Sequence, residues 1–418
     1  MFAKARHLYS TAGYSFPYLL AFLLPFGINY APLLILWTTT YLLFGNPLHG
    51  FKQVFRNPWT YALLAFFCLH VAGYWLSVNK AEALTSIEVK LSFFAFPLLI
   101  FCVNYEELNI KKIIIAFVSG CLISVIFCVF KASYTYLFEH TNTFFYSDFS
   151  YFLHPSYLAM YLVLAQLIVM LYYKKWLAHI AYLDYKIGFM TCIFLTGIFL
   201  SSSKMGIISA FVLLPVTFAV ILFNRGYKKT IAGLALSLVL GLIIVYKLFP
   251  SPFERLQVAF TVTSSSQQID KTATESTAVR ILIWKEAANI IKHNMAFGVT
   301  PGDANDRLYK AYEEQGLTGA LSKKLNAHNQ YLQTFIGSGV PGFVLLCLMT
   351  VGTIVIGFLK RNFMLALFSI LITLNFLVES MLQTQAGIVF FVFFLCLFLK
   401  YNLSTLSPAS VQEPGAKP

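Results

Sequence analysis

The chain has 418 residues, of which 58% are hydrophobic and 11% are charged, and its mean hydropathy is +0.72. A soluble protein of this length cannot bury so much apolar surface, so the composition excludes a water-soluble globular protein and indicates a polytopic membrane protein. The formal net charge is +13. Its distribution along the chain is explained by membrane topology, and we expect no nucleic acid as a partner.

Twelve apolar segments predict an all-α membrane protein with about twelve transmembrane helices, a few of them shorter or more broken than the usual length of about 20 residues. The segments are residues 14–26, 28–44, 58–78, 86–103, 112–137, 156–173, 185–201, 205–223, 230–249, 340–359, 362–380 and 385–401. The basic start MFAKARHLYS is followed by no small-residue cleavage site. The first segment is therefore interpreted as a retained span.

These segments divide the chain into four parts. Residues 1–249 hold the first nine spans, residues 250–339 form a long loop, residues 340–401 hold the last three spans, and residues 402–418 form a tail. The loop contains nine of the 30 basic residues and eight of the 17 acidic ones. This mixture predicts a folded, water-facing element, because long loops escape the charge bias of short ones.

The orientation follows from the remaining Lys and Arg residues. If both termini are cytoplasmic, sixteen of these residues lie on the inner side and only five on short outer loops or outer helix ends. The five are Lys80, Lys90, Lys131, Lys204 and Lys247. Because cytoplasmic loops carry the excess of positive charge, this split places residues 250–339 on the outer face.

Cysteine usage and motifs indicate neither a disulfide nor a bound cofactor. All seven cysteines lie within predicted spans, and none lies in the long loop. The sequence has no His/Cys spacing of the zinc type and no glycine-rich phosphate loop. We therefore expect no metal and no cofactor.

The first candidate site is SSSKMG, residues 201–206, a tight turn between two spans. Lys204 stands where its ammonium group reaches the outer interface. One interpretation is a lysine that extends to the interface with no further role. The alternative is an anion-binding corner, in which Ser203 and the neighbouring serines and glycine act with Lys204.

The second candidate is the stretch ESTAVRILIWKEAANIIKH in the long loop. Ile281, Trp284, Ala288 and Ile291 follow helical spacing and predict an amphipathic helix on the outer leaflet, with Ser276 or Thr277 as its N-cap. Arg280 then lies in the first turn, where an arginine fork above free backbone N–H groups suits a phosphate. The alternative is a surface arginine paired with Glu275 or Glu286.

The third candidate is NAHNQYLQTFIGSGVPG, residues 326–342. By the spacing i, i+3, i+4 and i+7, residues 328, 331, 332 and 335 are predicted to share one helical face. His328 is either a structural interfacial histidine or a base that takes a proton from a hydroxyl group. Asn326 and Asn329 could orient its ring or a sugar hydroxyl, and Tyr331 lies on the same face.

Two further polar groups belong with this candidate. Glu379, at the outer end of the penultimate span, needs a partner, and His328 or an arginine is the obvious one. The aromatic stretch FFYSDFSYFLHPSYLAMY before the sixth span carries Tyr146 and His154. Such a stretch is either an ordinary interfacial aromatic belt or part of the same site.

Taken together, SSSKMG, VRILIWKEA, FGVTPGD and HNQYLQTFIGSGVPG resemble the O-antigen ligase family of membrane glycosyltransferases, over about residues 190–390. The resemblance implies a GT-C-like helical fold with a helical periplasmic loop in the bacterial inner membrane. It also implies metal-independent transfer of a glycan, with inversion, from undecaprenyl diphosphate to an acceptor hydroxyl, such as that of a lipid A core sugar.

The resemblance assigns roles to residues. His328 takes the position of the family's essential histidine, and Arg280 takes that of the loop arginine thought to hold the diphosphate. Lys204 stands where the family usually has an arginine, so the charge is kept without the bidentate fork. Glu379 matches an acidic position that could support the basic cluster.

Other classes of membrane protein have the same motifs or a similar arrangement of apolar spans. O-antigen or exopolysaccharide polymerases and bacterial protein O-oligosaccharyltransferases use the same donor with a different acceptor. A transporter of lipid-linked sugars is less favoured, because the predicted spans are almost free of charge and the polar groups gather on one face.

Reporter fusions test this topology. A reporter fused after Lys229 is expected to report a cytoplasmic position, and one inserted within residues 271–277 a periplasmic position, because the positive residues are split sixteen to five. Periplasmic signals from both fusions would overturn the number of spans before the loop.

Overall fold

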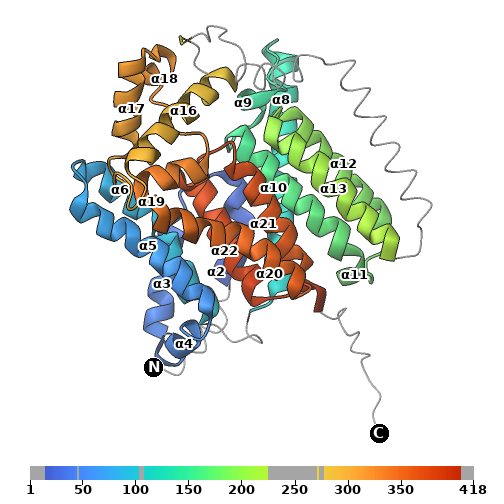
Figure 1. Ribbon diagram of the computed structural model, residues 1–418. Coiled ribbons are helices and arrows are strands. Elements are labelled where there is room, and N and C mark those ends of the chain that lie inside the picture. The colour runs from blue at the N-terminus through green and yellow to red at the C-terminus, as the bar shows by residue number, and fades with distance from the viewer. Residues whose placement is uncertain (1–14, 45–46, 103–107, 225–270, 273–276, 406–418) are drawn as a thin grey trace.

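The computed structural model describes residues 15–44, 47–102, 108–224, 271–272 and 277–405 (Figure 1). Every regular element in these ranges is a helix, and no β-strand occurs among them. The all-α class predicted from composition is therefore confirmed for the described residues.

Seven helices are long and apolar enough to cross a membrane, and each matches a predicted span. They are Pro58–Leu76 (α5), Lys80–Phe101 (α6 Lys80–Lys90 and α7 Ser92–Phe101), Ile110–Phe138 (α8), Pro155–Trp176 (α10 Pro155–Ile168, η2 Val169–Tyr173 and α11 Lys174–Trp176), Leu183–Leu200 (α12), Lys204–Leu222 (within α13, Lys204–Asn224), and Gln330–Leu359 (α19 Gln330–Cys347, η3 Leu348–Gly352 and α20 Thr353–Leu359).

Four more predicted spans are shorter apolar helices. They are Ser15–Phe26 (α2 Ser15–Leu23 and η1 Leu24–Phe26), Ala31–Leu43 (in α3, Ala31–Phe44), Phe363–Phe376 (α21) and Gln385–Lys400 (α22). The predicted span at residues 230–249 lies outside the described residues. The total of twelve therefore stays a prediction.

The remaining short helices connect the spans or lie at their outer ends. They are α4 (Pro47–Val54), α9 (Tyr146–Phe149), α16 (Thr277–His293), α17 (Ala304–Gln315), α18 (Thr318–Ser322), η4 (Met381–Gln383) and η5 (Leu403–Thr405). All seven cysteines are free thiols. Each lies in or directly after one of the apolar helices, as the sequence predicted.

Helix α10 is the buried centre of the molecule. All its residues from Leu158 onward are buried, and the ring of Tyr161 stacks on that of Phe390 in α22 with 4.1 Å between centroids. The Tyr161 hydroxyl also donates to the carbonyl oxygen of Ala386 at 2.6 Å. Because α10 is held on all sides, its N-terminus is a fixed point at the outer end of the spans.

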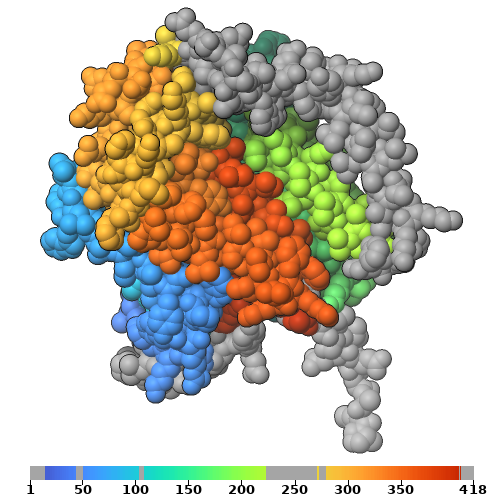
Figure 2. All heavy atoms as spheres, viewed as in Figure 1, coloured from blue at the N-terminus to red at the C-terminus, as the bar shows by residue number. Residues whose placement is uncertain are grey.

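Helices α16, α17 and α18 and the start of α19 form a small outer unit at one end of the spans (Figures 1 and 2). They share a core of their own, which is separate from the core among the spans. Its buried residues are Val279, Ile283, Ala287, Ala304, Leu308, Tyr312, Leu317, Ala320, Ala327 and Ile336.

The residues of α16 that are buried in this core differ from the apolar face that the sequence predicted. Ile283 and Ala287 are fully buried, whereas Ala288, assigned to the apolar face, is exposed. The prediction placed the apolar face of α16 against lipid. In the structure, α17 and α19 pack on the neighbouring face of this helix. The helix begins at Thr277, and the alternative cap Ser276 lies outside the described residues.

Helix α19 begins at Gln330, ten residues before the predicted tenth span, and bends at Gly339. The loop after α16 is fastened across this bend by two backbone hydrogen bonds, from Val299 to Ile336 (2.8 Å) and from Val340 to Met295 (2.9 Å). Gly298 and Gly339 face each other there with φ of +74° and +56°. A Cβ atom on Gly298 would lie 2.5 Å from a backbone oxygen, so only glycine fits.

Asp303, the last residue of FGVTPGD, fixes the outer unit to the turn between α5 and α6. Its carboxylate accepts hydrogen bonds from the backbone N–H groups of Val78 (2.9 Å) and Asn79 (2.8 Å) and from the hydroxyl of Thr300 (2.9 Å). Partial burial would raise the pKa of Asp303, but these donors outweigh it and hold the pKa below its usual value. The motif thus has a structural role in the described fold.

Substituting Gly298 tests the fastening of the outer unit to the bend. Gly298→Ala is expected to lower the free energy of unfolding by about 1–3 kcal/mol, because alanine is strained at positive φ and its Cβ meets backbone atoms. The measurement is the melting temperature of the purified protein in detergent. Gly188→Ala is the control, because nothing lies within 4 Å of a Cβ at that helical position; equal losses from both variants would contradict the account.

Candidate active site

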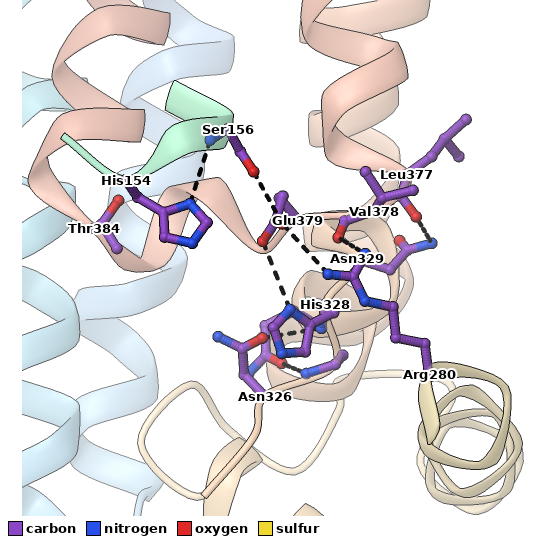
Figure 3. A network of polar contacts seen from close by, with 12 residues as sticks. His154, Ser156, Arg280, Asn326, His328, Asn329, Leu377, Val378, Glu379 and Thr384 are labelled. Carbon is purple, nitrogen blue, oxygen red and sulfur yellow. Dashed lines mark hydrogen bonds and ion pairs between the residues drawn. The ribbon is translucent and has the colours of Figure 1, made fainter. Parts of the chain in front are cut away.

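Glu379 is the centre of a polar network at the end of the spans that carries the outer unit (Figure 3). It lies three residues beyond the end of α21, and its side chain is 17% exposed. Its carboxylate is 3.5 Å from Nη2 of Arg280 and 3.6 Å from Nδ1 of His328, and it accepts a hydrogen bond from the hydroxyl of Ser156 at 3.4 Å. Three segments that are far apart in sequence therefore meet at one carboxylate.

Arg280 reaches this carboxylate from the end of the first turn of α16, which begins at Thr277. Its Nη1 donates to the carbonyl oxygen of Val378 at 3.0 Å, and its side chain remains 35% exposed. One turn further along α16, the indole N–H of Trp284 donates to the carbonyl oxygen of Ala327 at 2.9 Å. The two contacts dock α16 against the segments of Glu379 and His328, so the alternative pairing of Arg280 with Glu286 is wrong, and Glu275 lies outside the described residues.

His328 lies directly before helix α19, not on its face as predicted. Asn329 caps the helix by accepting a hydrogen bond from the N–H of Leu332 at 3.1 Å, so the helical spacing starts only at residue 330. His328 itself has φ of +44°, in the left-handed region. The strained backbone turns its ring toward Glu379, where Nδ1 is buried.

The two asparagines fix the backbone on either side of His328. The side-chain oxygen of Asn326 accepts a hydrogen bond from the N–H of His328 at 2.9 Å, and the side-chain amide of Asn329 donates to the carbonyl oxygen of Leu377 at 3.0 Å. They orient the residue through its main chain. A direct contact of either amide with a sugar stays a prediction.

Tyr331 points among the spans. Its hydroxyl donates to the hydroxyl of Thr350 at 3.1 Å, and its ring lies 6.1 Å from that of Phe376. These contacts anchor the first turn of α19 on η3 and α21. A role of Tyr331 in substrate binding stays a prediction.

The aromatic stretch before α10 contributes to the site. His154 caps α10, accepting the N–H of Ser156 at 3.4 Å, and lies close enough to Glu379 to favour its charged form. Tyr146 has φ of +58°, and its ring is 6.4 Å from that of His154. Ser156 was missed by the sequence analysis, although its place in the first turn of a helix marks an anion-favouring position.

Lys204 begins α13 and is exposed, and the preceding Ser203 is buried. The Ser203 hydroxyl accepts the N–H of Gly206 at 3.2 Å, so it caps the helix. One turn inside the spans, the side-chain amide of Asn375 donates to Ser209 at 3.4 Å. Lys204 lies five residues before Ser209 and Glu379 lies four residues after Asn375, so both follow this contact toward the same end of the spans.

The charges of the network explain why Glu379 is ionised. Burial would raise the pKa of this carboxyl, but its contact with His328 and the charge of Arg280 outweigh burial and lower the pKa from the usual value of 4.5. A carboxylate held this way balances the cluster of basic side chains. It also gives the imidazole of His328 a fixed acceptor on one side.

The fold and this network define a class: an all-helical membrane protein with a histidine, an arginine and a carboxylate joined at one end of its spans. Residues 189–347 match the family model described as O-antigen ligase, which confirms the resemblance to that family. The match supports a membrane glycosyltransferase of the ligase or polymerase type. A search of the curated proteins gave no match to the chain.

The matched range covers Lys204, Arg280 and His328 but not Glu379 or His154. Both were candidates in the sequence analysis, and the geometry of the network, not the family model, is what supports their place in the site. They come from α10 and from the loop after α21, which close the cluster from the side of the spans.

Replacing the central carboxylate tests the network. Glu379→Gln is expected to lower the free energy of unfolding at pH 7 by about 1.5–3 kcal/mol, because a buried charged contact is lost. The folded pKa of Glu379 lies below 4.5, so its contribution is fully present above pH 4.5 and is lost as the pH falls through the folded value.

The measurement is the difference in melting temperature between wild type and variant from pH 7 to pH 3. Glu313→Gln, at an exposed position of α17, is the control and is expected to show no such difference. A gap between wild type and Glu379→Gln that stays constant across this range would contradict the assignment.

Proposed function

We propose that the protein transfers a glycan from undecaprenyl diphosphate to an acceptor hydroxyl at the periplasmic face of the bacterial inner membrane. The observation that carries the proposal is the contact of His328 and Arg280 with one carboxylate at the outer end of the spans. The contact supports the proposal because it brings an imidazole, which can accept a proton, and a guanidinium, which can bind a phosphate, side by side at one end of the spans.

His328 is proposed as the base. Its Nδ1 faces Glu379, so the ring presents Nε2 to the acceptor. In the proposed single displacement, Nε2 takes the proton of the acceptor hydroxyl. The acceptor oxygen bonds to the anomeric carbon from the face opposite the leaving group, and the bond from that carbon to the diphosphate oxygen breaks, which inverts the configuration.

Arg280 and Lys204 are proposed to stabilise the departing diphosphate. The main-chain carbonyl of Val378 holds one nitrogen of Arg280 in place, and the guanidinium has further N–H donors for phosphate oxygens. Around Glu379 the cluster contains one carboxylate against the guanidinium of Arg280 and the imidazoles of His328 and His154. This donor set fits an anion and not a divalent cation, which supports a metal-independent reaction.

We propose lipid A core sugar as the acceptor, as in an O-antigen ligase. Polymerase and protein O-oligosaccharyltransferase activities use the same donor chemistry. Deleting the gene and separating the envelope glycans distinguishes them: loss of long-chain lipopolysaccharide with intact lipid-linked chains indicates a ligase. Single-repeat glycans indicate a polymerase, and loss of glycoproteins a protein glycosyltransferase.

Variants at three positions separate the proposed roles. His328→Ala is expected to abolish most transfer while donor binding persists. Arg280→Ala and Lys204→Ala are expected to weaken both donor binding and transfer, with the rate falling by about 10²–10³ for a lost cation. Lys204→Arg keeps the charge and adds a fork, so it is expected to keep most activity.

The measurements are donor affinity and transfer rate on detergent-purified variants whose melting temperatures match that of wild type. Full transfer by a folded His328→Ala protein would return this histidine to a structural role. A silent Lys204→Ala would make Lys204 a residue that merely extends to the interface.

A further inference from the structure

A cavity lies in the outer unit, between α16 and α17, and none of the residues of the Glu379 network lines it. Its volume is about 250 Å³, and it is open to solvent. It is lined mainly by polar side chains, including Glu286, Asn289, His293, Asn294, Arg307 and Gln315. We call it the α16–α17 groove.

Glu286 is the feature that marks this groove as a binding site. Its exposed fraction is 8%, yet among the described residues its carboxylate has no hydrogen-bond or ion-pair partner. The carboxylate therefore faces the solvent-open groove with both oxygens available to accept hydrogen bonds from a ligand.

The other lining groups supply complementary hydrogen-bonding atoms. The amide of Asn294 donates to the carbonyl oxygen of Ile290 at 2.9 Å, which leaves its oxygen as an acceptor. Nδ1 of His293 lies 2.9 Å from the carbonyl oxygen of Asn289, so Nδ1 is the donor there and Nε2 faces outward as an acceptor. Arg307 and Lys310 add donors at the edge.

The charges of the groove select the class of ligand. The two carboxylates Glu286 and Glu314 balance the two cations Arg307 and Lys310, so the formal charge is zero with neutral histidine. A phosphate site would hold cations alone. Balanced carboxylates, amides and cations suit a neutral group with several hydroxyls, each of which donates and accepts.

We propose that the α16–α17 groove binds one sugar unit of a glycan chain, with Glu286 accepting hydrogen bonds from its hydroxyls. The proposal rests on the proposed function, and it adds a subsite at a distance from the reacting bond. Glu286 lies six residues after Arg280, about 9 Å along α16, on the side turned toward α17. A sugar several units from the diphosphate, or one of the acceptor chain, lies at that distance.

The test uses full-length protein in detergent and two glycans from the host strain, released by mild acid. One is the chain cleaved from the lipid carrier, and the other is the core oligosaccharide cleaved from lipid A. Binding is measured by calorimetry and by saturation-transfer NMR. Binding of the first glycan assigns the groove to the donor, and binding of the second assigns it to the acceptor.

Glu286→Gln is expected to weaken binding of that glycan about tenfold or more, the effect of losing a charged hydrogen bond. Glu313→Gln, on α17 outside the groove, is the matched control and is expected to bind as wild type does. If Glu286→Gln does not fold, Asn289→Ala at the exposed edge takes its place, with the same expected direction.

Two results would overturn the proposal: neither glycan binds the folded wild-type protein, or both bind wild type and Glu286→Gln equally. Failure of the proposed function is distinguishable, because Arg280→Ala and His328→Ala are expected to bind the glycan normally without transferring it. Full transfer by those variants refutes the function, whatever the groove binds.

Discussion

One largely buried carboxylate constrains one end of the spans of this membrane protein. Glu379 follows the end of α21, and its side chain is largely removed from water, so its charge requires partners from elsewhere in the chain. Arg280 comes from the long loop, His328 from the turn before α19, and Ser156 from the first turn of α10. Satisfying a single charge thus brings the loop, its returning helix and the central span to one point.

The packed spans give this point its rigidity. The N–H of Glu379 donates to the carbonyl oxygen of Asn375 at 3.0 Å, and the side chain of Asn375 reaches Ser209 in α13. The helix that starts at Lys204 is therefore tied to the segment that carries Glu379. On the other side, Gly298 against Gly339 and the hydrogen bonds of Asp303 fix the outer unit to α19 and α5.

Hydropathy predicted the eleven apolar helices that the described residues form, because transfer into lipid depends on local composition, and motifs singled out most residues of the candidate site. Hydropathy and spacing did not predict the features that depend on contacts between helices. The buried face of α16 is set by α17 and α19, which a single-helix pattern does not contain. The left-handed backbone of His328 follows from caps by Asn326 and Asn329, and Ser156 gained meaning only when α10 met Glu379.

The geometry of Arg280 explains how one cation serves both fold and chemistry. Its contact with the Val378 carbonyl is short at 3.0 Å, whereas its distance to the Glu379 carboxylate is 3.5 Å. In the proposed function, a diphosphate would compete only with the longer contact, while the shorter one would hold the side chain in position. The other carboxylate oxygen of Glu379 lies 3.6 Å from Nδ1 of His328. Because Arg280 and His328 contact different oxygens, Arg280 could engage a phosphate while the contact of Glu379 with the imidazole stays in place.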